Sequence, residues 1–166
     1  MNSGSGQQLV TANPERANGV ASMWLVKEGQ GSVECQPGDK IPYGSKIRLQ
    51  HVRTGKNLHS HLVASPLTRQ QEVTCYGNNG DGDTGDNWIV QPKVYKSGSS
   101  YWERDTIVWI NHVDTGAFLG SSTKSEFNQM SCGNRCPVMN HLEMFAKNRA
   151  DAQTEWKAEH GVYLQK

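Results

Sequence analysis

Apolar and polar side chains alternate along residues 46–51, where Ile47, Leu49 and His51 fall on one side of an extended chain. Thr54-Gly55 follows directly, and glycine supplies the positive φ that a tight turn requires. A second short run of strand-like residues begins after that turn. This pattern predicts a β-hairpin that buries one face.

The same pattern recurs further along the chain. Residues 110–122 repeat the frame His-Val-x-Thr-Gly-x-x-Leu-x-Ser found in residues 49–61, and Val108, Ile110 and His112 alternate ahead of the second Thr-Gly turn. An isolated hairpin is only marginally stable in water, so the two copies are expected to pack against each other. The chain therefore contains an internal repeat.

Tryptophans indicate a third copy of this unit. Similar intervals separate an apolar residue from a tryptophan in three places: Val10 to Trp24, Val73 to Trp88, and Leu142 to Trp156. Four strands repeated about three times at roughly 60 residues predict an all-β fold, and a β-trefoil fits better than a propeller, whose repeats have about 40 to 50 residues. Trp24, Trp88 and Trp156 are expected to be equivalent core residues.

The repeats are expected to span residues 1–26, 27–92 and 93–166 of a single domain. The first has no counterpart of the opening hairpin, so we expect it to be truncated and to contain only the second half of the unit. Residues 140–152 include good helix formers, but Leu142 and Met144 alternate with polar residues as in a strand. A strand is expected there, and a short helical turn within residues 147–153 stays open.

Net charge and hydropathy argue against nucleic-acid binding and against a membrane-spanning segment. Seventeen basic and sixteen acidic side chains leave a formal net charge of +1, which gives no long-range attraction for nucleic acid. No run of about 18 apolar residues exists, so no membrane span is expected. The chain opens at Met1 without an apolar signal segment, so a cytosolic protein, a trimmed protein and an incomplete start are all compatible with this beginning.

Four cysteines are compatible with an oxidising compartment without proving it: Cys35, Cys75, Cys132 and Cys136. The sequence Cys132-Gly-Asn-Arg-Cys136 could close a small disulfide loop, and two free thiols are an equal alternative.

Candidate chemistry gathers in the second repeat. His59 and His61 project from one strand face, but the sequence shows no third ligand, so no metal site and no cofactor are expected. The acidic loop 78–86 departs from the EF-hand pattern and predicts a solvated turn. His51 and His112 hold equivalent positions, which favours a structural role in binding a turn carbonyl. No catalytic residue is expected, because no nucleophile motif occurs.

Ligand binding at the second repeat is a further hypothesis. A trefoil offers three related surface pockets, and the candidate ligand-binding residues are Arg53, Asn57, His59 and His61. An ordinary polar hairpin surface is the alternative.

Several blocks resemble a known family. These are Leu58-His-Ser-His61, Ala64-Ser-Pro-Leu67, Gln71-Glu-Val73, Gly80-Asp-Gly-Asp83 and Asp86-Asn-Trp88 in the centre, Gly4-Ser-Gly-Gln-Gln8 with Val10-Thr11 at the start, and Tyr101-Trp-Glu-Arg-Asp105 with Trp156-Lys-Ala158 towards the end. They look like the repeats of the stromal cell-derived factor 2 family, whose repeat is the MIR motif. The resemblance covers essentially the whole chain. In the third repeat, Gly120-Ser-Ser122 stands where the second has His59-Ser-His61.

The resemblance implies a β-trefoil of three MIR repeats in the endoplasmic reticulum lumen or secretory pathway. It implies a non-enzymatic role in protein quality control, with a luminal J-domain co-chaperone, a luminal heat-shock ATPase, secretory client proteins and O-mannosyl glycans as partners. The chain ends at Lys166 without a retention tetrapeptide of the Lys-Asp-Glu-Leu kind.

Two alternatives stay open. One is a carbohydrate-recognising MIR domain of the protein O-mannosyltransferase type. The other is a cytosolic trefoil that senses inositol phosphates, for which the basic residues Lys46, Arg48, Arg53 and Lys56 are few.

Overall fold

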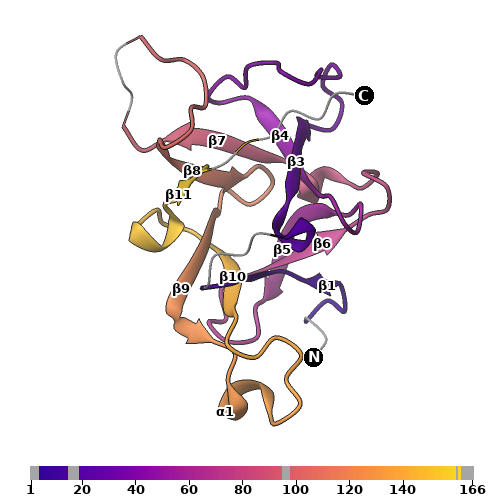
Figure 1. Ribbon diagram of the computed structural model, residues 1–166, viewed down its shortest axis with the longest axis vertical. Coiled ribbons are helices and arrows are strands. Elements are labelled where there is room, and N and C mark those ends of the chain that lie inside the picture. The colour runs from indigo at the N-terminus through magenta and orange to yellow at the C-terminus, as the bar shows by residue number, and fades with distance from the viewer. Residues whose placement is uncertain (1–3, 15–18, 95–97, 160, 162–166) are drawn as a thin grey trace.

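The computed structural model describes residues 4–14, 19–94, 98–159 and 161. The expectations about Met1 and about the C-terminal tetrapeptide therefore concern residues outside the described part. Strands dominate the molecule, and Figure 1 shows the four-residue helix α1 (Gln129–Cys132) at one end of its long axis. None of the helices in the described ranges is long and apolar enough to cross a membrane.

Eleven strands form one sheet among the described residues. In chain order they are β1 (Gln8–Leu9), β2 (Thr11–Ala12), β3 (Trp24–Glu28), β4 (Lys46–His51), β5 (Asn57–Ala64), β6 (Gln71–Tyr76), β7 (Trp88–Pro92), β8 (Ile107–His112), β9 (Phe118–Glu126), β10 (Leu142–Lys147) and β11 (Trp156–Lys157). Three short 3-10 helices join them: η1 (Val20–Ser22), η2 (Thr84–Asp86) and η3 (Ala152–Thr154). The expected strand within residues 140–152 is confirmed as β10, and the short helical turn lies later than residues 147–153 would place it, at η3.

Seven of these strands close a barrel. The order is β6-β5-β4-β7-β8-β9-β10, and β10 returns to β6 through the pairs Phe145 with Glu72 and Ala146 with Gln71. The remaining strands extend this barrel, since β1 pairs with β6, β2 with β10, β3 with β4, and β11 with β8. Closure leaves the seven strands without an open edge, which confirms the all-β prediction.

Both predicted hairpins are present. Gly55 and Gly116 have φ values of 67° and 69°, and their amides donate to the carbonyls of His51 and His112 at 2.8 and 2.9 Å. Burial alternates along β4 and β8, as the sequence pattern predicts.

The three tryptophans differ in burial. Trp88 is fully buried, whereas Trp24 and Trp156 are half-buried and pack against the outside of the core cluster. The indole nitrogens of Trp88 and Trp156 donate to the carbonyls of Leu58 and Leu119 at 2.9 and 2.8 Å, so these two tryptophans make matching hydrogen bonds. Trp88 belongs to the core cluster and the other two pack against it, and that all three are equivalent core residues stays a prediction.

Strand register corrects one sequence alignment. Ser60 pairs with Val73, and Ser121 pairs with Met144. Met144, rather than Leu142, is therefore the counterpart of Val73. Met144 precedes Trp156 by 12 positions whereas Val73 precedes Trp88 by 15, so the connection after β10 is three residues shorter than the one after β6.

Candidate functional site

His59 lies on β5 and faces two carboxylates of the η2 turn. Its Nδ1 is 3.0 Å from Asp86 Oδ1 and 3.5 Å from Asp83 Oδ1. His59 is 5 % exposed and Asp86 is fully buried, whereas the Asp83 side chain is 54 % exposed. A buried imidazole and a buried carboxylate therefore meet below an exposed carboxylate.

Asn57 holds Asp86 from the other side. Its Nδ2 donates to Asp86 Oδ2 at 2.9 Å and to the carbonyl of Gly80 at 3.0 Å. The Oδ1 of this fully buried side chain has no hydrogen-bond partner among the described residues. Asn57 is a support for the turn rather than a surface ligand group.

The loop 78–86 is packed against β5. Asp83 caps η2 by accepting from the amide of Gly85 at 2.9 Å, and Asp86 Oδ2 accepts from the amide of Asp83 at 3.1 Å. A Cβ on Gly85 would lie 2.4 Å from His59 Cε1, and one on Gly82 would lie 1.7 Å from Asp86 Oδ2. The expected solvated turn is correct only for its exposed half, because glycines bring the other half onto the two buried side chains.

His61 belongs to a second cluster. Its Nε2 lies 3.0 Å from Oε2 of Glu72, a side chain that is almost fully buried on β6. Glu72 also accepts from the amides of Gly4 and Ser5 at 2.6 and 3.2 Å and from the Ser5 hydroxyl at 2.6 Å. Burial alone would raise the pKa of the Glu72 carboxyl, but the hydrogen bonds from Ser5, His61 and Gly4 outweigh it and lower this pKa.

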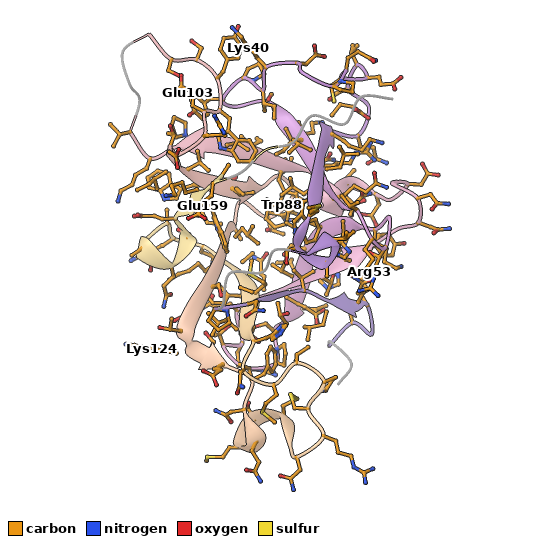
Figure 2. The ribbon with its side chains drawn as sticks, viewed as in Figure 1. Lys40, Arg53, Trp88, Glu103, Lys124 and Glu159 are labelled. Carbon is orange, nitrogen blue, oxygen red and sulfur yellow. A yellow bond between two sulfur atoms is a disulfide. The ribbon has the colours of Figure 1, made fainter. Side chains whose placement is uncertain are left out.

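Arg53 stands apart from the other candidates. It is exposed on the β4–β5 turn, and Figure 2 shows it at the edge of the molecule while Trp88 lies at the centre. The structure therefore brings together three of the four residues that the sequence indicated. His59 and His61 share a strand face as expected, with ring centroids 5.0 Å apart.

Three acidic residues of this site were missed by the sequence reasoning about ligands: Glu72, Asp83 and Asp86. Each of these residues belongs to a sequence block that resembles the family, and that resemblance is the signal by which they could have been identified.

His51 and His112 have the structural role that their repeat positions predict. Each Nδ1 lies 2.9 Å from a threonine hydroxyl, that of Thr54 or Thr115. The Nε2 of His112 lies 2.9 Å from the carbonyl of Gly85, and that of His51 lies 3.0 Å from the carbonyl of Ala21. Burial lowers the pKa of His112, so the neutral ring is the form that the fold favours.

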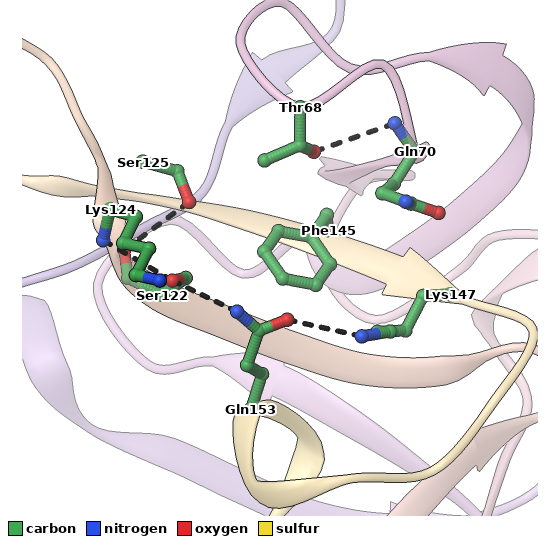
Figure 3. Close-up of a pocket in the computed structure, with 8 residues that line it drawn as sticks. All are labelled: Thr68, Gln70, Ser122, Lys124, Ser125, Phe145, Lys147 and Gln153. Atoms are coloured by element: carbon green, nitrogen blue, oxygen red, sulfur yellow. Dashed lines mark hydrogen bonds between the residues drawn. The ribbon is translucent and has the colours of Figure 1, made fainter.

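A small cavity is lined by residues of β9, β10 and η3. Its volume is about 150 Å³, and Ser122 and Gln153 line it at positions equivalent to His61 and Gly85. Figure 3 shows the Phe145 ring among polar side chains, with Gln153 donating to Ser122 Oγ and accepting from Lys147 Nζ, each at 3.0 Å. The cavity is therefore a polar pocket with one aromatic wall.

The cysteines divide into two kinds. Cys132 and Cys136 form a disulfide, which decides between the two alternatives that the sequence left open. Cys35 and Cys75 are free thiols. Burial raises the pKa of Cys75 to about 12.

Comparison with known proteins identifies the barrel. Residues 3–155 match the family model of the MIR domain, so this is a MIR-domain protein. The chain is 39 % identical over 97 % of its length to a stromal cell-derived factor 2-like protein of Dictyostelium discoideum, and 35 % identical over 98 % to human stromal cell-derived factor 2, covering 70 % of each. The chain belongs to the stromal cell-derived factor 2 family.

Solved structures agree with that assignment. The crystal structure of the SDF2-like protein from Arabidopsis thaliana covers 99 % of this chain at 36 % identity with a TM-score of 0.85, and 83 % of that chain is matched. A yeast protein O-mannosyltransferase complex contains the same fold at 24 % identity with a TM-score of 0.74, over 21 % of the matched chain. Neither the domain match nor the names of the relatives indicate an enzyme activity.

Proposed function

We propose that this chain is a non-enzymatic binding module that acts in protein quality control in the lumen of the endoplasmic reticulum. It binds a luminal J-domain co-chaperone, a luminal heat-shock ATPase or secretory client glycoproteins. The observation that carries this proposal is the similarity of almost the whole chain to stromal cell-derived factor 2-like proteins. The chain spans between 66 and 70 % of the length of these relatives. The Cys132–Cys136 disulfide also suits an oxidising compartment.

The same proposal includes a β-trefoil built from three MIR repeats, of which the first is short. Equivalent contacts support it. Trp24 packs on His51 and Trp88 packs on His112, with ring centroids 5.0 and 4.8 Å apart. In this arrangement, a tryptophan that opens the last strand of one repeat lies on a histidine that ends the first strand of the next.

An exposed apolar surface gives the module a place to bind a polypeptide. We define the β3–β4 patch as Val20, Met23 and Val52, which are 52, 48 and 43 % exposed. They are neighbours, because the amide of Val52 donates to the carbonyl of Met23, and the amide of Met23 donates to the carbonyl of Val20. Exposed apolar groups that gather in this way are typical of protein-binding surfaces.

The test is direct binding of the purified chain to a purified luminal J-domain co-chaperone and heat-shock ATPase, measured by calorimetry. Met23→Glu introduces a charge into the β3–β4 patch and is expected to weaken binding at least about tenfold, a change of ~1.4 kcal/mol. Met130→Glu is the matched control, because Met130 is 98 % exposed on α1 at another part of the surface.

Equal loss in both variants would argue against the patch, and absence of binding by the unmodified chain would argue against the proposed function. Substitution of His59 by alanine is unsuitable for this test, because His59 is buried against Asp86 and Gly85 and its loss would disturb the fold.

Recognition of O-mannosyl glycans is the second candidate, and the polar pocket beside Phe145 favours it. Hydroxyl and amide groups around one aromatic ring suit a sugar. Titration with O-mannosyl peptides, followed by NMR, tests this function. Shifts confined to Ser122, Phe145 and Gln153 would support it, and their absence at millimolar sugar would refute it.

A further inference from the structure

Three donor atoms from two separate segments converge at the η2 turn. His59 Nδ1 lies 3.0 Å from Asp86 Oδ1 and 3.5 Å from Asp83 Oδ1, and the three ligand atoms all lie within 4.8 Å of one another. Two ligands of one tetrahedral Zn²⁺ ion lie about 3.3 Å apart, given bonds of about 2.0 to 2.2 Å. From this geometry we infer that His59, Asp83 and Asp86 form a binding site for a divalent transition-metal ion of the Zn²⁺ type.

The charges at this turn favour a cation. Asp86 is fully buried and Asp83 is beside it, yet among the described residues no lysine or arginine forms an ion pair with either carboxylate. Buried carboxylates are normally paired with a cation or bound to a metal, because an isolated buried charge is strongly unfavourable. A metal ion would supply the positive charge that no lysine or arginine of the described residues gives to Asp86.

A buried acceptor without a partner lies next to the same carboxylate. Asn57 donates to Asp86 through Nδ2, while its Oδ1 is buried and makes no hydrogen bond to any described residue. Such a group calls for a water molecule or an ion nearby.

The third unit shows which of these groups the turn itself requires. Asp151 caps η3 as Asp83 caps η2, and both helices have a complete capping box. At the other two positions of the metal site, however, the third unit has Gly120 and Thr154 in place of His59 and Asp86. The capped turn therefore forms without the histidine and without the second carboxylate, so the turn itself does not require these two groups.

Two glycines accompany the site and are absent from the third unit. Gly82 and Gly85 leave room for Asp86 and His59, since a Cβ at either position would lie within 2.4 Å of those side chains. Ala150 and Gln153 stand at the equivalent positions before and within η3. The two ligands and the space around them thus occur together in the second unit and are both missing from the third.

The set of ligands indicates the class of metal. An imidazole nitrogen with two carboxylate oxygens suits Zn²⁺ better than Ca²⁺ or Mg²⁺, which prefer oxygen ligands alone. His61 is not a ligand, because its Nε2 faces Glu72. The exposed Asp83 side chain leaves the fourth position to solvent, as in zinc sites with three protein ligands and one water.

The experiment is a calorimetric titration of the full chain with Zn²⁺, repeated with Co²⁺ as a spectroscopic probe. We expect one saturable site, with Co²⁺ absorption bands of a tetrahedral site. Asp83→Asn should weaken Zn²⁺ binding at least about tenfold, because it removes a charged ligand, while asparagine preserves the helix cap.

Asp151→Asn is the matched control, since it makes the same change at the equivalent cap of η3 and should leave the affinity unchanged. A chain that shows no saturable binding at millimolar Zn²⁺ would refute the inference, and so would equal affinities of the two variants. NMR of the His59 ring provides an independent measurement. If the ring stays doubly protonated when Zn²⁺ is added, a proton and not a metal ion balances the carboxylate charge, and this result would also overturn the metal site.

Discussion

The indole of Trp88 lies on the imidazole of His112 with ring centroids 4.8 Å apart and an interplanar angle of 56°. The two residues are directly opposite each other in the β7–β8 ladder. Trp24 and His51 make the same contact in the β3–β4 ladder at 5.0 Å. The Trp88 ring and its indole nitrogen thus bind different neighbours, His112 and the carbonyl of Leu58.

Loss of the Trp88 indole nitrogen is expected to destabilise the barrel. Trp88→Phe keeps most of the buried ring but leaves the carbonyl of Leu58 without its donor, at a cost of about 1–3 kcal/mol. Trp109→Phe is the control, because the indole nitrogen of Trp109 is buried without a hydrogen-bond partner among the described residues. Urea unfolding of both variants measures the difference, and equal losses would contradict the role of this hydrogen bond.

The free energy of unfolding should depend on pH because of Glu72. Its pKa is lowered in the folded chain, so the stabilisation is complete above the usual glutamate value of about 4.3 and is lost as the pH falls through the folded value. Glu72→Gln is expected to cost about 1–3 kcal/mol at pH 7 and clearly less at pH 3, as measured by urea unfolding.

The control for this prediction is Glu103→Gln. Among the described residues, the Glu103 carboxylate accepts from the Ser99 hydroxyl alone and at the surface, so its substitution should change stability by less than about 0.5 kcal/mol at either pH. A Glu72→Gln penalty that is the same at pH 3 and pH 7 would show that the ionised form has no special part in holding Gly4 and Ser5.

His112 adds a second pH dependence at higher pH. Burial lowers its pKa, so the unfolded chain binds a proton more readily than the folded chain does. Stability should therefore fall as the pH drops below the usual histidine value of about 6.5, towards the folded pKa. Thermal unfolding between pH 5 and pH 8 should show a shallower slope in His112→Asn than in the unmodified chain, whatever the absolute stability of the variant.

The cysteines should react in an order set by burial. Without reductant, iodoacetamide should leave Cys75 unmodified in the folded chain at pH 8, because this thiol is buried and its pKa is raised to about 12. Unfolding should expose Cys75 and Cys35, and only reduction should add Cys132 and Cys136. Peptide mass spectrometry checks this order, and early labelling of Cys75 would contradict its burial.

Local pattern was sufficient for the hairpins. Period-two alternation followed by Thr-Gly predicts β4 and β8 with their turns, because strand pleating and the positive φ of glycine depend on neighbouring residues only. Alternation also distinguished β10 from a helix. Leu142 was the wrong counterpart of Val73, because an interval along the chain does not show strand register. Met144 precedes Trp156 by 12 positions whereas Val73 precedes Trp88 by 15, so the connection after β10 is three residues shorter.

The sequence by itself therefore determined the strands, the repeat and the family, since these follow from periodicity and from matching blocks along the chain. Only the tertiary structure decided which residues His59 and His61 face. Asp86 is 27 positions from His59, and Glu72 is 11 positions from His61. The β5–β6 ladder and the η2 turn bring these distant residues together. The two histidines, which the sequence alone placed on the surface, therefore contact buried carboxylates.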